Sequence, residues 1–345
     1  MIALALLLFI LPALTARAEA PSAPAIRIAT FGSDLTRSGP GLLLRDILSG
    51  KDAQVAAVVA AIGATGADIL LLTGIDHDHG LVALSALAER ISAAGIEYPY
   101  LFALRPNRGM ATGLDLDGDG RAGGPDDAQG FGRFSGARGM ALLSRYPILG
   151  AEARDFSDFL WRDLPGARGP DPMRPEVAAV QRLATTGFWE VPVRLPDGQR
   201  LRLLGFHAGP PAFGRGRRNL DRNHDETAFW AALLDARLPL APPEPPFVLL
   251  GNANLDPFDG DGRHEAIRAL LAHRALQDPA PRSAGGPAAS AAQGGVNATH
   301  RGDPALDTAD HRDTPPGPGN LRVTYVLPSS DLTVRAAGVL WPPPA

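Results

Sequence analysis

Two unbroken apolar runs constrain the fold of this chain more than any other feature. Residues 68–73 read DILLLT and residues 246–250 read PFVLL, so each has the length of a strand and shows no alternation of polar and apolar residues. A run of this kind is typical of a strand that is buried on both faces. The chain is therefore expected to form a layered α/β fold in which helices or a second sheet cover each sheet.

Helical and strand patterns alternate along the rest of the chain, and adjacent strand patterns follow near its end. We expect further strands at 25–31, 139–143, 188–195, 201–207, 321–327 and 331–339, and helices at 42–64, 81–94, 222–237 and about 263–273. Asn223 or Asp221 can cap the helix that begins at 222. Segments rich in Pro and Gly at 105–137, 156–180, 208–219 and 279–320 are expected to be long loops, which are often functional. No shift in composition divides the chain, so we expect a single domain over 21–345 and a monomer.

The first twenty residues, MIALALLLFILPALTARAEA, have the pattern of a signal peptide. The apolar part has the length of a signal-peptide core, and both Ala16-Arg17-Ala18 and Ala18-Glu19-Ala20 fit the small-x-small cleavage rule. No later apolar run is long enough for a membrane helix. We expect residues 1–20 to be a signal peptide and the protein to be periplasmic or secreted.

Charge gives little indication of a nucleic-acid partner. The 345 residues carry a formal net charge of −4, which is not the electrostatic signature of tight nucleic-acid binding. There is no cysteine, so disulfide bonds contribute nothing to stability.

Polar residues and glycines follow the predicted strands where those strands end. These are Gly32 with Asp34, Gly74 with Asp76, His207, and Asn252 with Asn254. Thr324 lies within the predicted strand at 321–327. In α/β folds ligands bind where strands end. We therefore expect these residues to surround a common site.

Six segments then resemble one known family. RIATF, DILLLTGID, GMALLSRYPI, GFHAGPP, GNANLDP and RVTYVLPS, in this order over about 25–341, are similar to the endonuclease/exonuclease/phosphatase superfamily, whose members are DNase I-like. The resemblance implies a four-layer α/β sandwich, in which two packed mixed β-sheets are flanked by helices. It also implies phosphoester hydrolysis with Mg²⁺ or Mn²⁺, because a dication must neutralise the anionic phosphate.

The positions that carry this chemistry in the family are mostly changed here. His207 and Asn254 match the family pattern. Gly32 replaces an Asn, Gly74 replaces the metal-holding Glu, and Asn252 and Thr324 each replace an Asp. The family's closing Ser-Asp-His segment does not follow, so we expect the 21–345 domain to be truncated at its C-terminus.

Two functions remain open on this comparison. The protein is either a catalytically impaired family member that binds a phosphorylated or polyanionic ligand, or a protein partner, in the family groove, or an active divalent-metal-dependent phosphodiesterase or nuclease with a displaced metal site. Asp34 and Asp76 each lie two residues after a glycine that replaces a family residue, so they face the same side of the strand as that glycine. They are the candidate ligands of the displaced site, with Asp78, or His77 with His79, as further candidates. The sequence leaves open whether the protein is an enzyme.

A second metal site is suggested by DLDGDGRAGGPD at 115–126. Asp115, Asp117, Asp119, the backbone carbonyl of Arg121, and Asp126 have the spacing of an EF-hand calcium loop, and a Gly at position six allows its sharp turn. The flanking residues do not have helical patterns. We therefore expect an isolated Ca²⁺ loop at 115–126.

Overall fold

The computed structural model describes residues 25–169, 173–214 and 216–342. The predicted signal peptide, residues 1–20, lies outside the described residues. Within them the strands are β1 Ile28–Gly32, β2 Ile69–Ile75, β3 Tyr100–Phe102, β4 Gly139–Ser144, β5 Arg154–Asp155, β6 Phe188–Arg194, β7 Arg200–His207, β8 Phe247–Asn252 and β9 Thr324–Pro328. The α-helices are α1 Leu42–Ser49, α2 Ala53–Thr65, α3 Val82–Ala93, α4 Pro175–Ala178, α5 Arg218–Leu234, α6 His264–Leu271 and α7 Gly285–Gln293.

The strands form two mixed sheets. The first has the order β1-β2-β4-β3 and the second the order β5-β6-β7-β8-β9. The pairs β1–β2 and β7–β8 are parallel and the other pairs are antiparallel. Parallel neighbours end at the same edge of a sheet, so β1 ends beside β2 and β7 ends beside β8.

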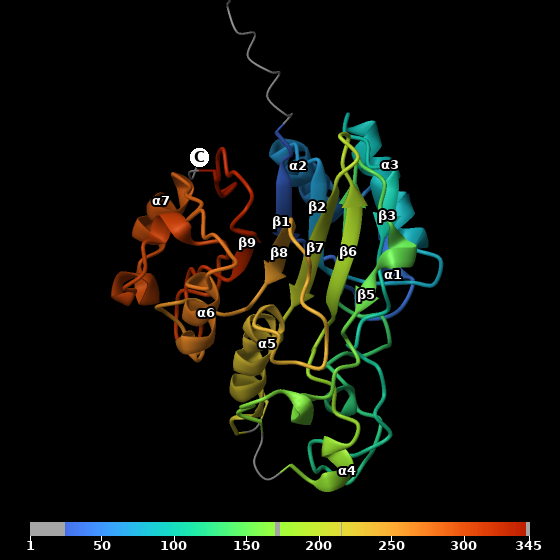
Figure 1. Ribbon diagram of the computed structural model, residues 1–345, viewed down its shortest axis with the longest axis vertical. Helices are drawn as coiled ribbons and strands as arrows, with labels where there is room; N and C mark the ends of the chain where they lie inside the picture. The colour runs from blue at the N-terminus through green and yellow to red at the C-terminus, as the bar shows by residue number, and fades with distance from the viewer. Residues whose placement is uncertain (1–24, 170–172, 215, 343–345) are drawn as a thin grey trace, which may run out of the picture.

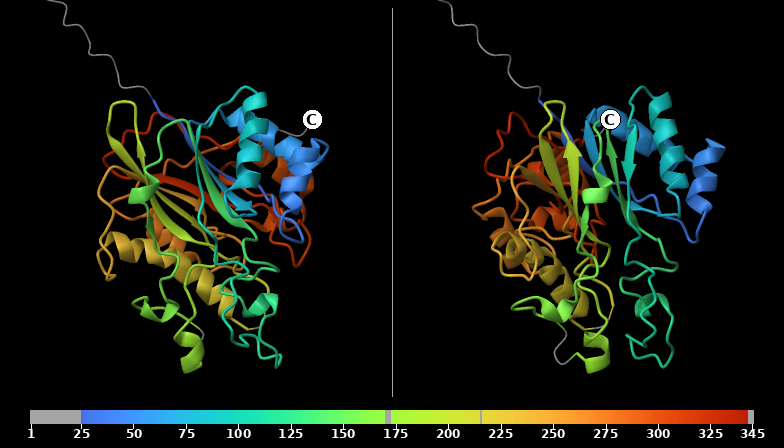
Figure 2. Two further views of the ribbon diagram at one scale, coloured as in Figure 1. Left: turned by 90° about the vertical axis from the view of Figure 1, so that its right-hand side faces the viewer. Right: turned by 45° about the vertical axis from the view of Figure 1, so that its right-hand side comes forward.

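The two sheets pack face to face with helices outside both of them (Figures 1 and 2). Leu71 and Leu142 of the first sheet share a buried cluster with Trp189, Leu203 and Leu250 of the second. The opposite face of the first sheet packs against α1, α2 and α3. The opposite face of the second sheet packs against α5 and α6. This is the predicted four-layer α/β sandwich, and burial on both faces explains why the central strands read as continuous apolar runs.

Several predicted elements differ from those observed. The helical pattern at 42–64 is two helices, since Gly50 ends α1 in a left-handed conformation and Asp52 caps α2 by accepting a hydrogen bond from the Val55 N–H. The strand predicted at 331–339 does not form; the segment makes one isolated bridge, between Gly338 and Arg282.

The predicted loop at 279–320 contains α7. Glycines at its start are required because a Cβ on Gly285 would lie 2.0 Å from the carbonyl oxygen of Trp341. The helix is therefore set by a tertiary contact and not by helix propensity, which is poor in a segment that begins Gly-Gly-Pro.

No single helix in the described ranges is long and apolar enough to cross a membrane. By length and composition alone, α1 and α2 taken together would be long and apolar enough, but the chain bends by 75° between them.

Candidate functional site

The predicted strand-end residues lie at one end of the sandwich. In the second sheet His207 pairs with Asn252, and Asn252 pairs with Thr324, so the three form one row across β7, β8 and β9. In the first sheet Gly32 pairs with Thr73, next to Gly74. Strand β1 packs against β8 and β9, which brings the two sets of strand ends together. The long loop between β3 and β4 and the segment with α4 extend beyond this end of the sheets (Figure 1).

The backbone at this end is unusual. Gly251 has φ 141°, and a Cβ there would lie 1.9 Å from the carbonyl oxygen of Phe206, so only glycine allows β7 and β8 to approach this closely. Asp34, Arg138 and Asn254 are non-glycine residues with φ of 48°, 49° and 49°. Residues in this left-handed region cost free energy and gather at functional sites.

Helix α5 holds the ends of β7 and β8 in place. The side-chain amide of Asn223 donates hydrogen bonds of 2.7 Å to the carbonyl oxygens of Gly209 and Ala253. Glu226 accepts hydrogen bonds from the backbone N–H groups of Thr185 and Gly209. Burial raises the pKa of Glu226 and the positive charge of Arg222 opposes this.

These contacts correct the predicted role of the polar residues around the helix start. Asn223 and Asp221 were expected to cap a helix that begins at 222. The helix begins at Arg218, its N-cap residue Arg217 makes no side-chain cap, and both predicted caps lie inside the helix in buried positions. The periodicity placed the helix too late because its first turns are polar yet buried.

His207 is accompanied by two arginines. Its side chain is 6% exposed, and its Nδ1 atom is buried without a hydrogen-bond partner among the described residues. Burial lowers the pKa of His207 well below its usual value, and the charges of Arg108 and Arg138 lower it further. The imidazole is therefore neutral at neutral pH and stands in a positive electrostatic field.

Arg108 is a buried cation whose own hydrogen bonds reach no carboxylate. It is 5% exposed and donates hydrogen bonds to the Thr186 hydroxyl, at 2.9 Å, and the Phe131 carbonyl, at 3.3 Å. Burial, and to a smaller extent the charge of Arg138, lowers its pKa to about 10, although Glu226 opposes this. Glu226 does not neutralise it, because that carboxylate is hydrogen-bonded to backbone N–H groups and faces Arg222.

Arg138 reaches the same place from the start of β4. Its side chain is 47% exposed and forms an ion pair of 2.5 Å with Asp34, whose side chain is 66% exposed. Its backbone N–H donates to the Asp76 carboxylate at 3.0 Å. Neither arginine was singled out from the sequence, where the high arginine content has no pattern that marks these two.

The strand ends do not fit a magnesium ion. Gly32, Gly74 and Thr324 offer no carboxylate. The side-chain oxygen of Asn252 accepts the N–H of Asn254, and the Asn254 amide donates to the Ala208 carbonyl. Mg²⁺ needs hard anionic oxygen ligands, and the positive charges around His207 would repel it.

The contacts of Asp34 and Asp76 give no support to the displaced metal site predicted there. The Asp76 carboxylate already accepts three hydrogen bonds, from the Thr36 hydroxyl and the N–H groups of Arg37 and Arg138. Asp34 faces a guanidinium. Neither belongs to a group of three potential metal ligands within the described part of the chain, and the same holds for Asp78, His77 and His79.

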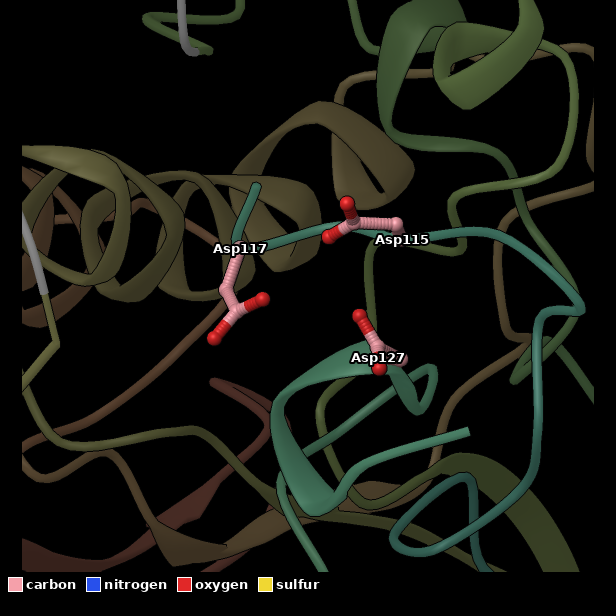
Figure 3. Close-up of side chains that lie close together, drawn as sticks. All are labelled: Asp115, Asp117 and Asp127. Atoms are coloured by element: carbon pink, nitrogen blue, oxygen red, sulfur yellow. The ribbon is translucent and has the colours of Figure 1, made fainter. Parts of the chain in front are cut away.

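The predicted calcium loop brings carboxylates together, but Asp127 takes the place of the predicted Asp126. Asp115, Asp117 and Asp127 place one oxygen each within 4.8 Å of one another, and Figure 3 shows these carboxylates around a shared space. The exposed Asp126 is not part of the group, because the 3₁₀ turn Pro125–Asp127 turns the buried Asp127 inward instead. Asp119 also lies outside the group and accepts the N–H of Arg121.

The three carboxylates can hold a metal ion. Two of them, Asp115 and Asp127, already accept hydrogen bonds from backbone N–H groups. Asp115 accepts the N–H groups of Gly118 and Gly120, and the Gly120 bond is the main cause of its lowered pKa. Asp127 accepts the N–H groups of Leu116 and Gly124, each at 2.7 Å. The guanidinium of Arg218 interacts electrostatically with Asp117 and Asp127 and so supplies part of the positive charge.

Two packed mixed sheets with helices outside both define an α/β-sandwich protein (Figures 1 and 2). A sequence profile of the Endonuclease/Exonuclease/phosphatase family matches residues 45–345, and the chain belongs to this family. The family that the sequence resembles and the fold expected from it are thus confirmed. A search of curated proteins finds no sequence match.

The chain is also similar to several solved structures at low sequence identity. An endonuclease/exonuclease/phosphatase from Beutenbergia cavernae is 16% identical with a TM-score of 0.49, and the alignment covers 90% of this chain and 65% of that one. A family protein from Leptotrichia buccalis is 14% identical with a TM-score of 0.48, and covers 90% of both chains. A mannosyl-6-phosphatase from Bacteroides thetaiotaomicron is 13% identical with a TM-score of 0.48, over 92% of this chain and 90% of that one. This chain thus spans 65% of the length of the Beutenbergia cavernae protein.

Proposed function

We propose that the protein binds a phosphorylated or polyanionic ligand at the strand ends and hydrolyses it poorly or not at all. The observation that carries the proposal is the exchange of charge at this site. Carboxylates that would hold a dication are replaced by neutral residues, while Arg108 and Arg138 supply positive charge beside His207.

The electrostatics favour an oxyanion as the occupant. A buried cation is costly unless an anion accompanies it. Among the described residues, Arg108 donates no hydrogen bond to a carboxylate, and the ion-pair partner of Arg138 is the exposed Asp34. The guanidinium fork matches the oxygens of a phosphoryl group, and a neutral imidazole can donate a further hydrogen bond.

The same residues oppose hydrolysis by the family mechanism. Without anionic oxygens at Gly74, Asn252 and Thr324 a metal cannot be held beside the phosphate, and losses of this kind cost several powers of ten in rate. A guanidinium can neutralise phosphate charge but cannot generate a metal-bound hydroxide. The expected protein is a receptor for phosphoryl groups built on an enzyme scaffold.

Binding of inorganic phosphate and pyrophosphate by isothermal titration calorimetry in excess EDTA tests the proposal. The wild type should bind without metal, and Arg108→Met and Arg138→Gln should each weaken binding about tenfold or more, the effect of losing a charge-assisted hydrogen bond. Arg133→Gln, an exposed change in the same loop, is the matched control. Hydrolysis of bis(p-nitrophenyl) phosphate with Mg²⁺, Mn²⁺ or Ca²⁺ at the rates of an active phosphodiesterase would refute the proposed loss of activity.

We further propose that Ca²⁺ occupies the group Asp115, Asp117 and Asp127 and that the protein is exported. Support for Ca²⁺ is the convergence of three carboxylates on a loop that also carries Arg108. The nearby Arg218 charge favours weak, millimolar-range affinity, as in extracellular calcium modules. Support for export is the composition of residues 1–20, and fractionation of cells that express the full chain tests it.

A further inference from the structure

A separate pocket lies on the helix side of the first sheet. Its volume is about 650 Å³, which is in the range of small-molecule sites. Much of its wall is apolar and comes from the start of α1, the start of α3 and the loop before β4. The side chains used below are Leu43, Leu44, Val82 and Phe134.

The polar groups of this pocket are unequally satisfied. Asp76 and Asp78 both line it, but Asp76 accepts three hydrogen bonds and Asp78 accepts the N–H groups of Val82 and Ala83 at 2.6 and 2.8 Å. These bonds fix the orientation of both carboxylates and use part of their acceptor capacity. The start of α3 is held by this Asp78 contact, which fixes one wall of the pocket.

The groups that remain are donors. Arg105 uses its Nε to donate to the Ser135 hydroxyl at 2.7 Å, and its two terminal nitrogens have no protein acceptor among the described residues. His77 and His79 also line the pocket without side-chain hydrogen bonds in the described part of the chain. Burial lowers the pKa of His77, and the charge of Arg105 lowers it further, although Asp78 opposes this. His77 is therefore a neutral donor at neutral pH.

We propose that this pocket binds a small amphiphilic oxyanion. Its carboxylate, sulfate or phosphate head lies at Arg105 and His77, and its apolar body lies against Leu43, Leu44 and Phe134. An apolar wall with a few convergent donors is the usual design of a site for such a molecule. The head group is an oxyanion because the terminal nitrogens of Arg105 are guanidinium donors for which the described residues supply no acceptor.

The pocket is distinct from the strand-end site. Phe134 and Ser135 line it, while Arg138, three residues further on, belongs to the strand-end site. Asp76 lies between the two, lining the pocket while it accepts the Arg138 N–H. The proposal therefore stands independently of the phosphoryl-binding function.

Isothermal titration calorimetry with octanoate, octan-1-ol and octylammonium tests the proposal on the full chain. Octanoate should bind saturably and about tenfold or more tightly than the alcohol, since the alcohol lacks the charge-assisted hydrogen bond, and octylammonium should not bind. Arg105→Gln should remove this preference. Val82→Trp, at a residue that is 50% exposed, should fill the pocket and abolish binding of both ligands without disturbing the core.

Controls separate the outcomes. Arg90→Gln, at the far end of α3, should bind octanoate like the wild type, and so should Arg108→Met, which alters only the strand-end site. Circular dichroism melts check that each variant is folded. Absence of saturable octanoate binding, equal affinity for octan-1-ol, or full binding by folded Val82→Trp would each overturn the proposal.

Discussion

The two buried arginines near α5 allow a sharp test of whether Arg108 is kept for a ligand. Burial lowers the pKa of both Arg108 and Arg222 to about 10 from an ordinary 12.5. At ~1.4 kcal/mol for each pH unit, this corresponds to about 3 kcal/mol of unfavourable free energy for each buried charge. Both remain charged at neutral pH, so this cost is fully present there and would be relieved only as the pH rises through the folded-state pKa.

Arg108 and Arg222 differ in the interactions that offset this unfavourable free energy. Arg108 donates two neutral hydrogen bonds, each worth about 1 kcal/mol net. Replacing it by Met, which keeps an apolar chain in the same space, should change the free energy of unfolding by at most about 1 kcal/mol, towards greater stability. Arg222 faces Glu226 and donates to four carbonyl oxygens, those of Gln129, Arg182, Leu183 and Ala184. Arg222→Met should cost roughly 3–5 kcal/mol because it leaves Glu226 buried and unpaired.

Urea denaturation followed by tryptophan fluorescence at neutral pH measures both variants. Phosphate should stabilise the wild type according to its binding, and this gain should disappear in Arg108→Met. Phosphate also stabilises proteins by exclusion from their surface. The stabilisation that remains in Arg108→Met measures this general contribution, and Arg133→Gln should respond to phosphate like the wild type. The reasoning is refuted if Arg108→Met, without phosphate, loses as much stability as Arg222→Met.

Three further predictions test other parts of the account. Gly74 has φ 76°, so Gly74→Ala should lower the free energy of unfolding by about 1–2 kcal/mol. At Gly32 an added Cβ would meet only ordinary contacts, so Gly32→Ala should be neutral or slightly stabilising. Equal urea midpoints for the two variants would contradict this. Burial and neighbouring carboxylates raise the pKa of Asp307 to about 7, so the wild type should lose stability as the pH rises from about 4 to 7. Asp307→Asn should be more stable than the wild type above that range, by a few kcal/mol, and this difference should vanish near pH 4. Calcium should raise the melting temperature of the wild type and not that of Asp127→Asn, and an equal rise in both would exclude the proposed site.

Gly74 is also the position at which the family resemblance implies a metal-holding Glu. A Glu at this position would adopt the left-handed backbone at the same cost as Ala, or would shift the backbone between Thr73 and Ile75, where the pairing of β2 with β4 is irregular.

The sequence predicts the layers of this fold well because burial leaves a direct pattern. Continuous apolar runs identified β2 and β8, and the short segments that follow the strands identified the family. Elements fixed by tertiary contacts left no such pattern. The polar first turns of α5 are buried against the strand ends, and α7 depends on backbone approach at its glycines.

The site was predicted only in part, for a related reason. His207, Asn252 and Thr324 lie side by side because they are end residues of β7, β8 and β9, which pair in register. Arg108 lies in a long loop and Arg138 at the end of that loop, and no sequence pattern defines the path of such a segment. The same limit explains the change from Asp126 to Asp127 in the carboxylate group, since a single turn decides which of two adjacent side chains points inward.

The most direct test of the central claim is phosphate binding measured by calorimetry on the purified protein, first in EDTA and then in excess Mg²⁺. If the charges of Arg108 and Arg138 stand in for the metal, the dissociation constant for phosphate should be the same in both solutions. Binding that appears only with Mg²⁺ would show that a dication is still held at the strand ends and would contradict the account.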